Sequence, residues 1–339
     1  MVHLRIVVPS DQSGHAMDLL ENTPSVCNLI FLERAARRPQ GDVILCDVAR
    51  EDASVIVSDL KELEIHEEGS IAMEDIDSLI SESADRAVHA AAGLPTDAVV
   101  WEEVESRTSE NIELSASFIA FMILAMLIAA VGILTDQLIL IIGAMVVGPE
   151  FGPIAGLSVA AVQRRTELAK RSLGALGLGL SAGIGATLLF TLALELAGLV
   201  PDDFSQEGHP FTDFISSPDA FSFIVAFIAG MAGVLSLTNA KSGALVGVLI
   251  SVTTIPAAAN IAVGAALGDW EEAAGALEQL ALNLGAIFLA CIGTLYVQRR
   301  LYLRRRHKHL QHGARTAAGL PIGHSRRKGS ATYQRPADE

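Results

Sequence analysis

Six long apolar stretches dominate the chain after its first hundred residues. They run over residues 115–134, 137–163, 172–200, 219–237, 242–268 and 274–298. A helix needs about 20 mostly apolar residues to cross the hydrocarbon core of a bilayer, and each stretch is close to that length or longer. Buried helices of a soluble domain do not recur in this way, so the sequence predicts an α-helical polytopic membrane protein with six spans.

Basic residues near the ends of the stretches predict the orientation, because Lys and Arg are enriched in cytoplasmic connections. The connection after the second stretch contains Arg164, Arg165, Lys170 and Arg171, and the last stretch runs directly into an arginine-rich segment. The connection 201–218 has several acidic residues and no Lys or Arg. We therefore expect both termini in the cytoplasm of a bacterial cell, with the spans in the inner (plasma) membrane.

The charge is divided unevenly along the chain. Residues 1–113 carry 8 basic and 24 acidic residues, residues 114–298 carry 5 and 13, and residues 299–339 carry 11 and 2. A nucleic-acid-binding protein needs a surplus of basic charge on a folded face. Only the tail has such a surplus, so nucleic acid is not expected as a partner.

Two of the apolar stretches are interrupted. The second contains GAMVVGPEFGPIAG, with Pro149 and Pro153 on either side of Glu150, and the fifth contains Pro256 directly after the run Thr253–Ile255. Proline removes a backbone donor and clashes with the preceding turn. The breaks fall in the second span of each group of three, and three spans per half give the halves opposite orientation. This pattern predicts two inverted 3+3 repeats with broken helices, which is typical of transporter binding sites. For Pro256 alone, a simple kink is an equally good interpretation.

Glu150 lies near the middle of its stretch. A charged side chain at that depth costs several kcal/mol and usually faces a polar interior that serves ions or protons. A protonated carboxyl bonded to the freed backbone is the structural alternative. Threonine, likewise, often bonds its own backbone instead of a ligand. The predicted substrate- or ion-binding residues are Gly148, Pro149, Glu150, Gly152, Pro153, Thr253, Thr254, Pro256, Asn260 and Asn283.

Residues 1–76 are predicted to form a small cytoplasmic α+β domain. Strands are expected at 3–8, 26–32, 42–48 and 70–73, and helices at 14–22 and 52–63. This order is the split βαβ, ferredoxin-like pattern. A helical linker, 77–113, then leads to the membrane domain, 114–298. The basic tail, 299–339, is predicted to be largely disordered beyond about residue 312, because it lacks apolar periodicity.

No motif in the chain indicates catalysis. Three cysteines provide no disulfide framework or zinc pattern. We expect Cys27 and Cys46 to be buried free thiols of the cytoplasmic α+β domain, called the head below. Neither an enzyme, a cofactor nor a metal is predicted. Basic residues after the last span are expected to attract anionic lipid headgroups or to pair with the acidic head. They are Arg299, Arg300, Arg304, Arg305 and Arg306.

The motif in the second stretch, with its basic turn and the spans that follow, resembles the bacterial and archaeal "uncharacterised hydrophobic domain" family, number 389 among domains of unknown function. The resemblance covers roughly residues 115–300 and implies a membrane fold, often preceded by a soluble domain. This chain differs from many members at Glu150, where apolar residues are common, and at Ile255-Pro256, where a double proline is common. The matching positions are Gly143, Ala144, Met145, Gly148, Pro149, Gly152, Pro153 and Gly156.

Two functions remain open from the sequence. The paired helix breaks and the midplane carboxylate predict a transporter or channel for an ion or small polar solute. The alternative is a membrane-anchored sensor or scaffold whose cytoplasmic domain binds a ligand or protein partner, although six spans exceed what an anchor needs. Pairs of small residues four apart favour close helix packing, within the bundle or in a homo-oligomer.

Overall fold

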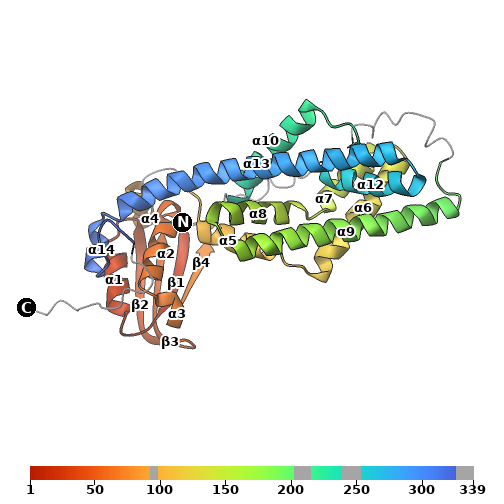
Figure 1. Ribbon diagram of the computed structural model, residues 1–339. Helices are drawn as coiled ribbons and strands as arrows, with labels where there is room; N and C mark the ends of the chain where they lie inside the picture. Colours follow the sequence, from red (N-terminus) through yellow and green to blue (C-terminus); the bar gives the residue numbers. More distant parts are fainter. Residues whose placement is uncertain (92–97, 202–214, 239–252, 326–339) are drawn as a thin grey trace, which may run out of the picture. The chain divides into compact units, whose positions relative to one another are not determined.

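A computed structural model of the protein (Figure 1) describes residues 1–91, 98–201, 215–238 and 253–325. The chain forms two compact units. The first contains Met1–Glu103 together with the chain from Arg299 onward, and the second is Val104–Gln298.

The first unit is built on one four-stranded antiparallel sheet. Its strands are β1 (Val2–Val8), β2 (Val26–Arg37), β3 (Gln40–Val48) and β4 (Ser70–Asp75), in the order β2-β3-β1-β4. The helices α1 (Ser13–Glu21), α2 (Arg50–Glu62) and α3 (Ile65–Glu68) connect the strands, and α4 (Glu82–Ala90) follows them. The order and the pairing agree with the predicted ferredoxin-like arrangement, and the short helix α3 was not predicted.

Alternation along the strands separates the two faces of the sheet. Leu4, Ile44 and Cys46 are fully buried in the core. Cys27 of β2 pairs with Asp47 of β3, the residue next to Cys46. Its side chain packs against α4. Neighbouring residues of a strand point to opposite faces. The two cysteines are therefore buried and free, as expected, on different faces of the sheet.

Residues 299–325 are folded into the first unit. The last long helix, α13 (Trp270–His309), continues past the predicted end of its span, and α14 (Gly313–Ala317) follows. Arg315 is fully buried and forms ion pairs with Asp59 and Glu62 of α2. The predicted disorder is thus wrong for residues 313–317. This segment lacks apolar periodicity, but its buried ion pairs keep it folded against α2.

Arg306 also forms contacts with the head. Its guanidinium pairs with Asp59 and Glu62 and donates to the Val55 carbonyl at 3.0 Å. Its side chain is only 9% exposed. Arg306 is therefore bound by carboxylates of the head, which is the second of the two roles that the sequence left open for these arginines.

The second unit is helical. It contains the end of α5 (Trp101–Asn111), then α6 (Ala116–Leu134), α7 (Leu138–Val147), α8 (Phe151–Gln163), α9 (Thr166–Leu196), α10 (Ala220–Thr238), α12 (Thr254–Leu267) and α13 up to Gln298. Within the described residues, α6, α9, α10 and α13 are long and apolar enough to cross a membrane, and α7 with α8 makes a fifth candidate span.

The predicted span 242–268 lies partly outside the described residues, which resume at 253; its second half is α12, a shorter apolar helix. The other five predicted stretches coincide with candidate spans. Helix α9 begins before the predicted residue 172, since no proline or glycine stops it inside the basic turn. Six spans and the inverted repeat stay predictions.

Close helix packing inside the unit depends on glycine. A Cβ on Gly179 would come within 2.9 Å of the Phe118 ring, and a Cβ on Gly183 would collide with Met126. Met122 and Met126 are fully buried in the core shared by α6, α7, α9 and α12. The small residues four apart on α9 therefore admit the bulky side chains of α6.

Candidate functional site

The predicted interruption of the second span is present. Helix α7 ends at Val147 and α8 begins at Phe151, with their axes bent by 48°. Pro149 has no N–H to give to the carbonyl four residues earlier, so the α-helical ladder fails at this point. Gly148 adopts extended backbone angles (φ −69°, ψ 129°), which carry the chain out of α7.

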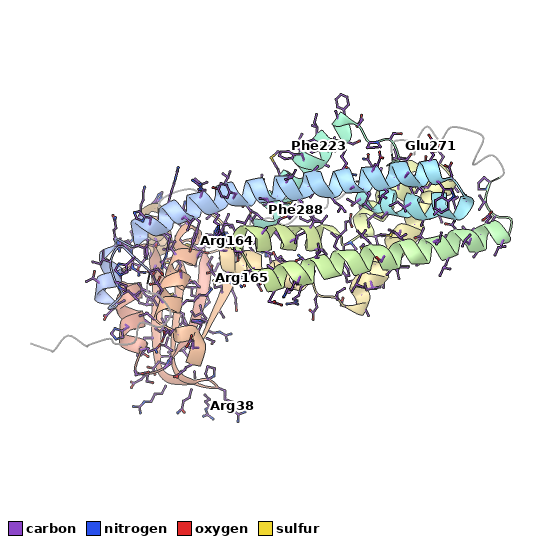
Figure 2. The ribbon with its side chains drawn as sticks, viewed as in Figure 1. Arg38, Arg164, Arg165, Phe223, Glu271 and Phe288 are labelled. Atoms are coloured by element: carbon purple, nitrogen blue, oxygen red, sulfur yellow. The ribbon has the colours of Figure 1, made fainter. Side chains whose placement is uncertain are left out.

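The break lies near the middle of the span. At 1.5 Å per residue, the ten residues of α7 and the thirteen of α8 extend about 15 Å and about 20 Å from it. A hydrocarbon core is about 30 Å thick. Figure 2 labels Arg164 and Arg165 at the far end of α8, where Arg165 pairs with Glu105. The basic turn follows the end of α8, and Glu150 lies near the middle of the α7–α8 pair.

Helix α12 begins in the same way as α8. Pro153 is the third residue of α8, and Pro256 is the third residue of α12. A first-turn residue has no acceptor for its N–H inside the helix, so proline is tolerated there. Pro153 and Pro256 therefore occupy equivalent positions in the two helices. Whether Pro256 also interrupts a longer span depends on residues before 253, outside the described ranges.

The starts of α8 and α12 meet. Glu150, only 3% exposed, accepts a hydrogen bond on Oε1 from the Thr254 hydroxyl at 2.7 Å. Its second oxygen, Oε2, is buried and has no hydrogen-bond partner. A Cβ built on Gly148 would come within 2.6 Å of Ile255 Cγ1. The structure thus brings Gly148, Glu150 and Thr254 together.

Thr253 links this point to α13. Asn283 Nδ2 donates to Thr253 Oγ1 at 2.9 Å, and Gln279 Nε2 lies 3.5 Å from the same hydroxyl. Both amides are buried, and Gln279 Oε1 has no partner. Gln279 was missing from the predicted site, although a polar residue four before Asn283 occupies the same helix face and is a usable signal.

Asn260 lies elsewhere. It follows Thr254 by six residues, about 9 Å along α12, and its amide nitrogen donates to Glu272 Oε1 at 2.6 Å. Its buried Oδ1 has no partner. The structure therefore separates Asn260 from Glu150 and places it beside the start of α13.

A cavity of about 150 Å³ adjoins the break. Gly148, Pro149 and Gly152 line it from the break, and Thr108 and Asn111 add polar groups from α5. One water needs roughly 10–15 Å³ of such volume, so several waters fit.

The apolar helices, the bent pair and the buried polar break together have the character of an α-helical membrane protein. Residues 145–289 match the family model described as "Domain of unknown function (DUF389)". This match confirms the family resemblance and covers the break, α8 to α12 and most of the apolar part of α13.

A relative from the archaeon Methanocaldococcus jannaschii, "Uncharacterized protein MJ0678", is 28% identical over 202 residues. The match covers 57% of this chain and 58% of that protein's length. No solved structure matches the chain.

Proposed function

We propose that the protein is a membrane transporter or channel for an ion or small polar solute, with its site where α8 and α12 begin. The observation that carries the proposal is the carboxyl group of Glu150. It is buried at mid-depth, bonded through one oxygen to Thr254, and has no partner on the other oxygen. A buried polar atom without a hydrogen bond costs free energy of folding. This cost favours a role of Glu150 in binding over a purely structural role.

The wider architecture of the proposal is six spans in two inverted halves, with both termini in the cytoplasm and the spans in the bacterial inner membrane. The equivalent positions of Pro153 and Pro256 support the repeat. The arginine contacts of Arg306 and Arg315 with α2 support a regulatory role for the head, because they tie the chain after the last span to that domain.

Purified protein in proteoliposomes tests the proposal. Gradients of protons, alkali cations, chloride and a neutral polar solute are imposed in turn, and the flux is compared with that of empty liposomes. We expect Glu150→Gln to lower the flux at least tenfold. Glu195→Gln is the matched control, because this carboxylate on α9 is exposed, and it should leave the flux unchanged.

Absence of protein-dependent flux for every gradient would refute a transport function. Equal flux in wild-type protein and Glu150→Gln, with both variants correctly inserted, would remove Glu150 from the site.

A further inference from the structure

The break, α12 and the first ten residues of α13 contain three buried side-chain oxygens without a hydrogen-bond donor. They are Glu150 Oε2, Asn260 Oδ1 and Gln279 Oε1. Each belongs to a side chain that is at most 3% exposed. The amide orientations follow from the contacts of their nitrogens: Asn260 Nδ2 donates to Glu272, and Gln279 Nε2 faces Thr253 Oγ1. The unpaired atoms are therefore acceptors.

These groups form a polar stripe along one helix hairpin. A tight turn at Gly268, which has φ +78°, reverses the chain between α12 and α13 (Figure 1). Thr253 and Asn260 are seven residues apart on α12, and Glu272 and Gln279 are seven apart on α13. Seven residues are two helical turns, about 10 Å, on one face. Hydrogen bonds cross between the helices at both levels.

The first turns of α8 and α12 offer an anion fewer backbone N–H groups than most helix starts do. Helix N-termini usually bind anions through free backbone N–H groups. Here Pro153 and Pro256 lack that group. The backbone nitrogen of Ile154 donates to the carbonyl oxygen of Glu150 at 3.4 Å. The backbone nitrogen of Ala257 donates to the carbonyl oxygen of Thr253 at 3.2 Å. The Thr254 hydroxyl already donates its hydrogen bond to the Glu150 carboxylate. The side-chain atoms that are left unpaired at the site are therefore acceptors.

Oxygen ligands of this kind suit hard metal cations. A proton satisfies the carboxylate alone, whereas neutral amide oxygens are good ligands for a metal ion. The break contributes one carboxylate, which balances one positive charge. A divalent ion there would leave an uncompensated charge in a medium of low dielectric constant, at high cost.

We propose that the site takes a monovalent alkali-metal cation, which passes from the level of Asn260 and Glu272 to Gln279, Thr253 and Glu150. This inference rests on the proposed function and names its substrate class. The polar stripe supplies oxygen ligands at two levels about 10 Å apart, and the ion moves between these levels.

Gln279→Leu tests the stripe, because it removes the unpaired oxygen and keeps a similar volume. Gln298→Leu is the matched control. Gln298 lies on the same helix, bonds Thr238 through its nitrogen and also has an unpaired oxygen, but it is nineteen residues away. In proteoliposomes carrying sodium or potassium gradients, Gln279→Leu should lower cation flux at least tenfold, and Gln298→Leu should stay within twofold of wild type.

Binding without flux is measured separately, so that a poorly folding variant does not decide the outcome. The thermal unfolding midpoint of detergent-solubilised wild type is compared in sodium, potassium and N-methyl-glucamine chloride at equal ionic strength. A ligand that binds only the folded state raises the midpoint, so we expect a rise in at least one alkali salt that is lost in Glu150→Gln.

The outcomes separate the two proposals. Wild-type flux of chloride, neutral solute or protons without alkali cations would overturn the cation assignment and leave a transport function intact. Lack of flux for every class would refute transport itself. Equal loss in Gln279→Leu and Gln298→Leu, or unfolding midpoints independent of the cation, would refute the site on the stripe.

Discussion

Replacement of Gly148 by alanine tests directly whether the two helix starts meet. The backbone of Gly148 is extended (φ −69°, ψ 129°), so alanine is compatible with its conformation. The only new atom is one Cβ. It would lie 2.6 Å from Ile255 Cγ1, 2.9 Å from Ile255 Cδ1 and 2.5 Å from Glu150 Oε2.

These contacts set the size of the effect. Carbon atoms pack at about 3.5–4.0 Å, so the break and α12 must separate by about 1 Å. Overpacking of this kind costs about 1–3 kcal/mol. Gly143→Ala is the matched control, because a Cβ at that position in α7 meets nothing within 4 Å. Inside a helix, alanine is better than glycine by about 1 kcal/mol.

The two variants should therefore change stability in opposite directions. We expect Gly148→Ala to lower the thermal unfolding midpoint in detergent and Gly143→Ala to leave it unchanged or raise it. Since 1 kcal/mol corresponds to roughly 2–4 °C for a unit of 150–250 residues, several degrees should separate them. Flux in proteoliposomes should fall only in Gly148→Ala.

A compensating change sharpens the test. Ile255→Ala removes two of the three atoms that the new Cβ meets and leaves Glu150 Oε2, so the double variant should be more stable than the sum of the single effects implies. If Gly148→Ala behaves like Gly143→Ala, or if the two substitutions are additive, the break does not pack against α12.

Two further predictions concern the first unit. Replacing Asp59 by asparagine should release the chain after α13, because Arg306 and Arg315 are then left with Glu62 as their shared carboxylate partner. Losing one partner of a buried pair costs about 3–5 kcal/mol, and limited trypsin digestion should cleave the segment 310–320 at least tenfold faster; an unchanged rate would contradict the role of these ion pairs. The second concerns Asp42, whose pKa is held below its ordinary value by the hydroxyl of Ser13, 2.6 Å away, and by the N–H of Arg34. A carboxyl whose pKa is lower in the folded state stabilises the fold above its unfolded pKa and loses that effect as the pH falls through the folded value. Ser13→Ala should accordingly lower the urea midpoint at neutral pH, with the difference from wild type vanishing in acid; a constant difference at all pH values would refute the assignment.

Much of the fold follows from local properties of the sequence. The length of each apolar run predicted α6, α9, α10 and α13, and the prolines beside Glu150 predicted the bend between α7 and α8. Alternation and turn residues predicted the four strands of the head. These features depend on neighbours within a few residues, which a sequence displays directly.

Partners far apart in the chain were harder to predict. Asn260 was expected at the site but bonds Glu272, whereas Gln279, outside the expected set, faces Thr253. The choice depends on which faces of α12 and α13 oppose each other. Periodicity indicates that a residue is polar within an apolar helix, but not which helix it meets.

The sequence alone predicted the long apolar helices, the break in the second stretch and a carboxylate at that break, because apolar length, proline and charge act locally. Only the tertiary structure decided that Glu150 meets Thr254 and that the arginines after the last span bind Asp59 and Glu62. Those contacts join residues more than a hundred positions apart, and their geometry is fixed by the packing of whole helices.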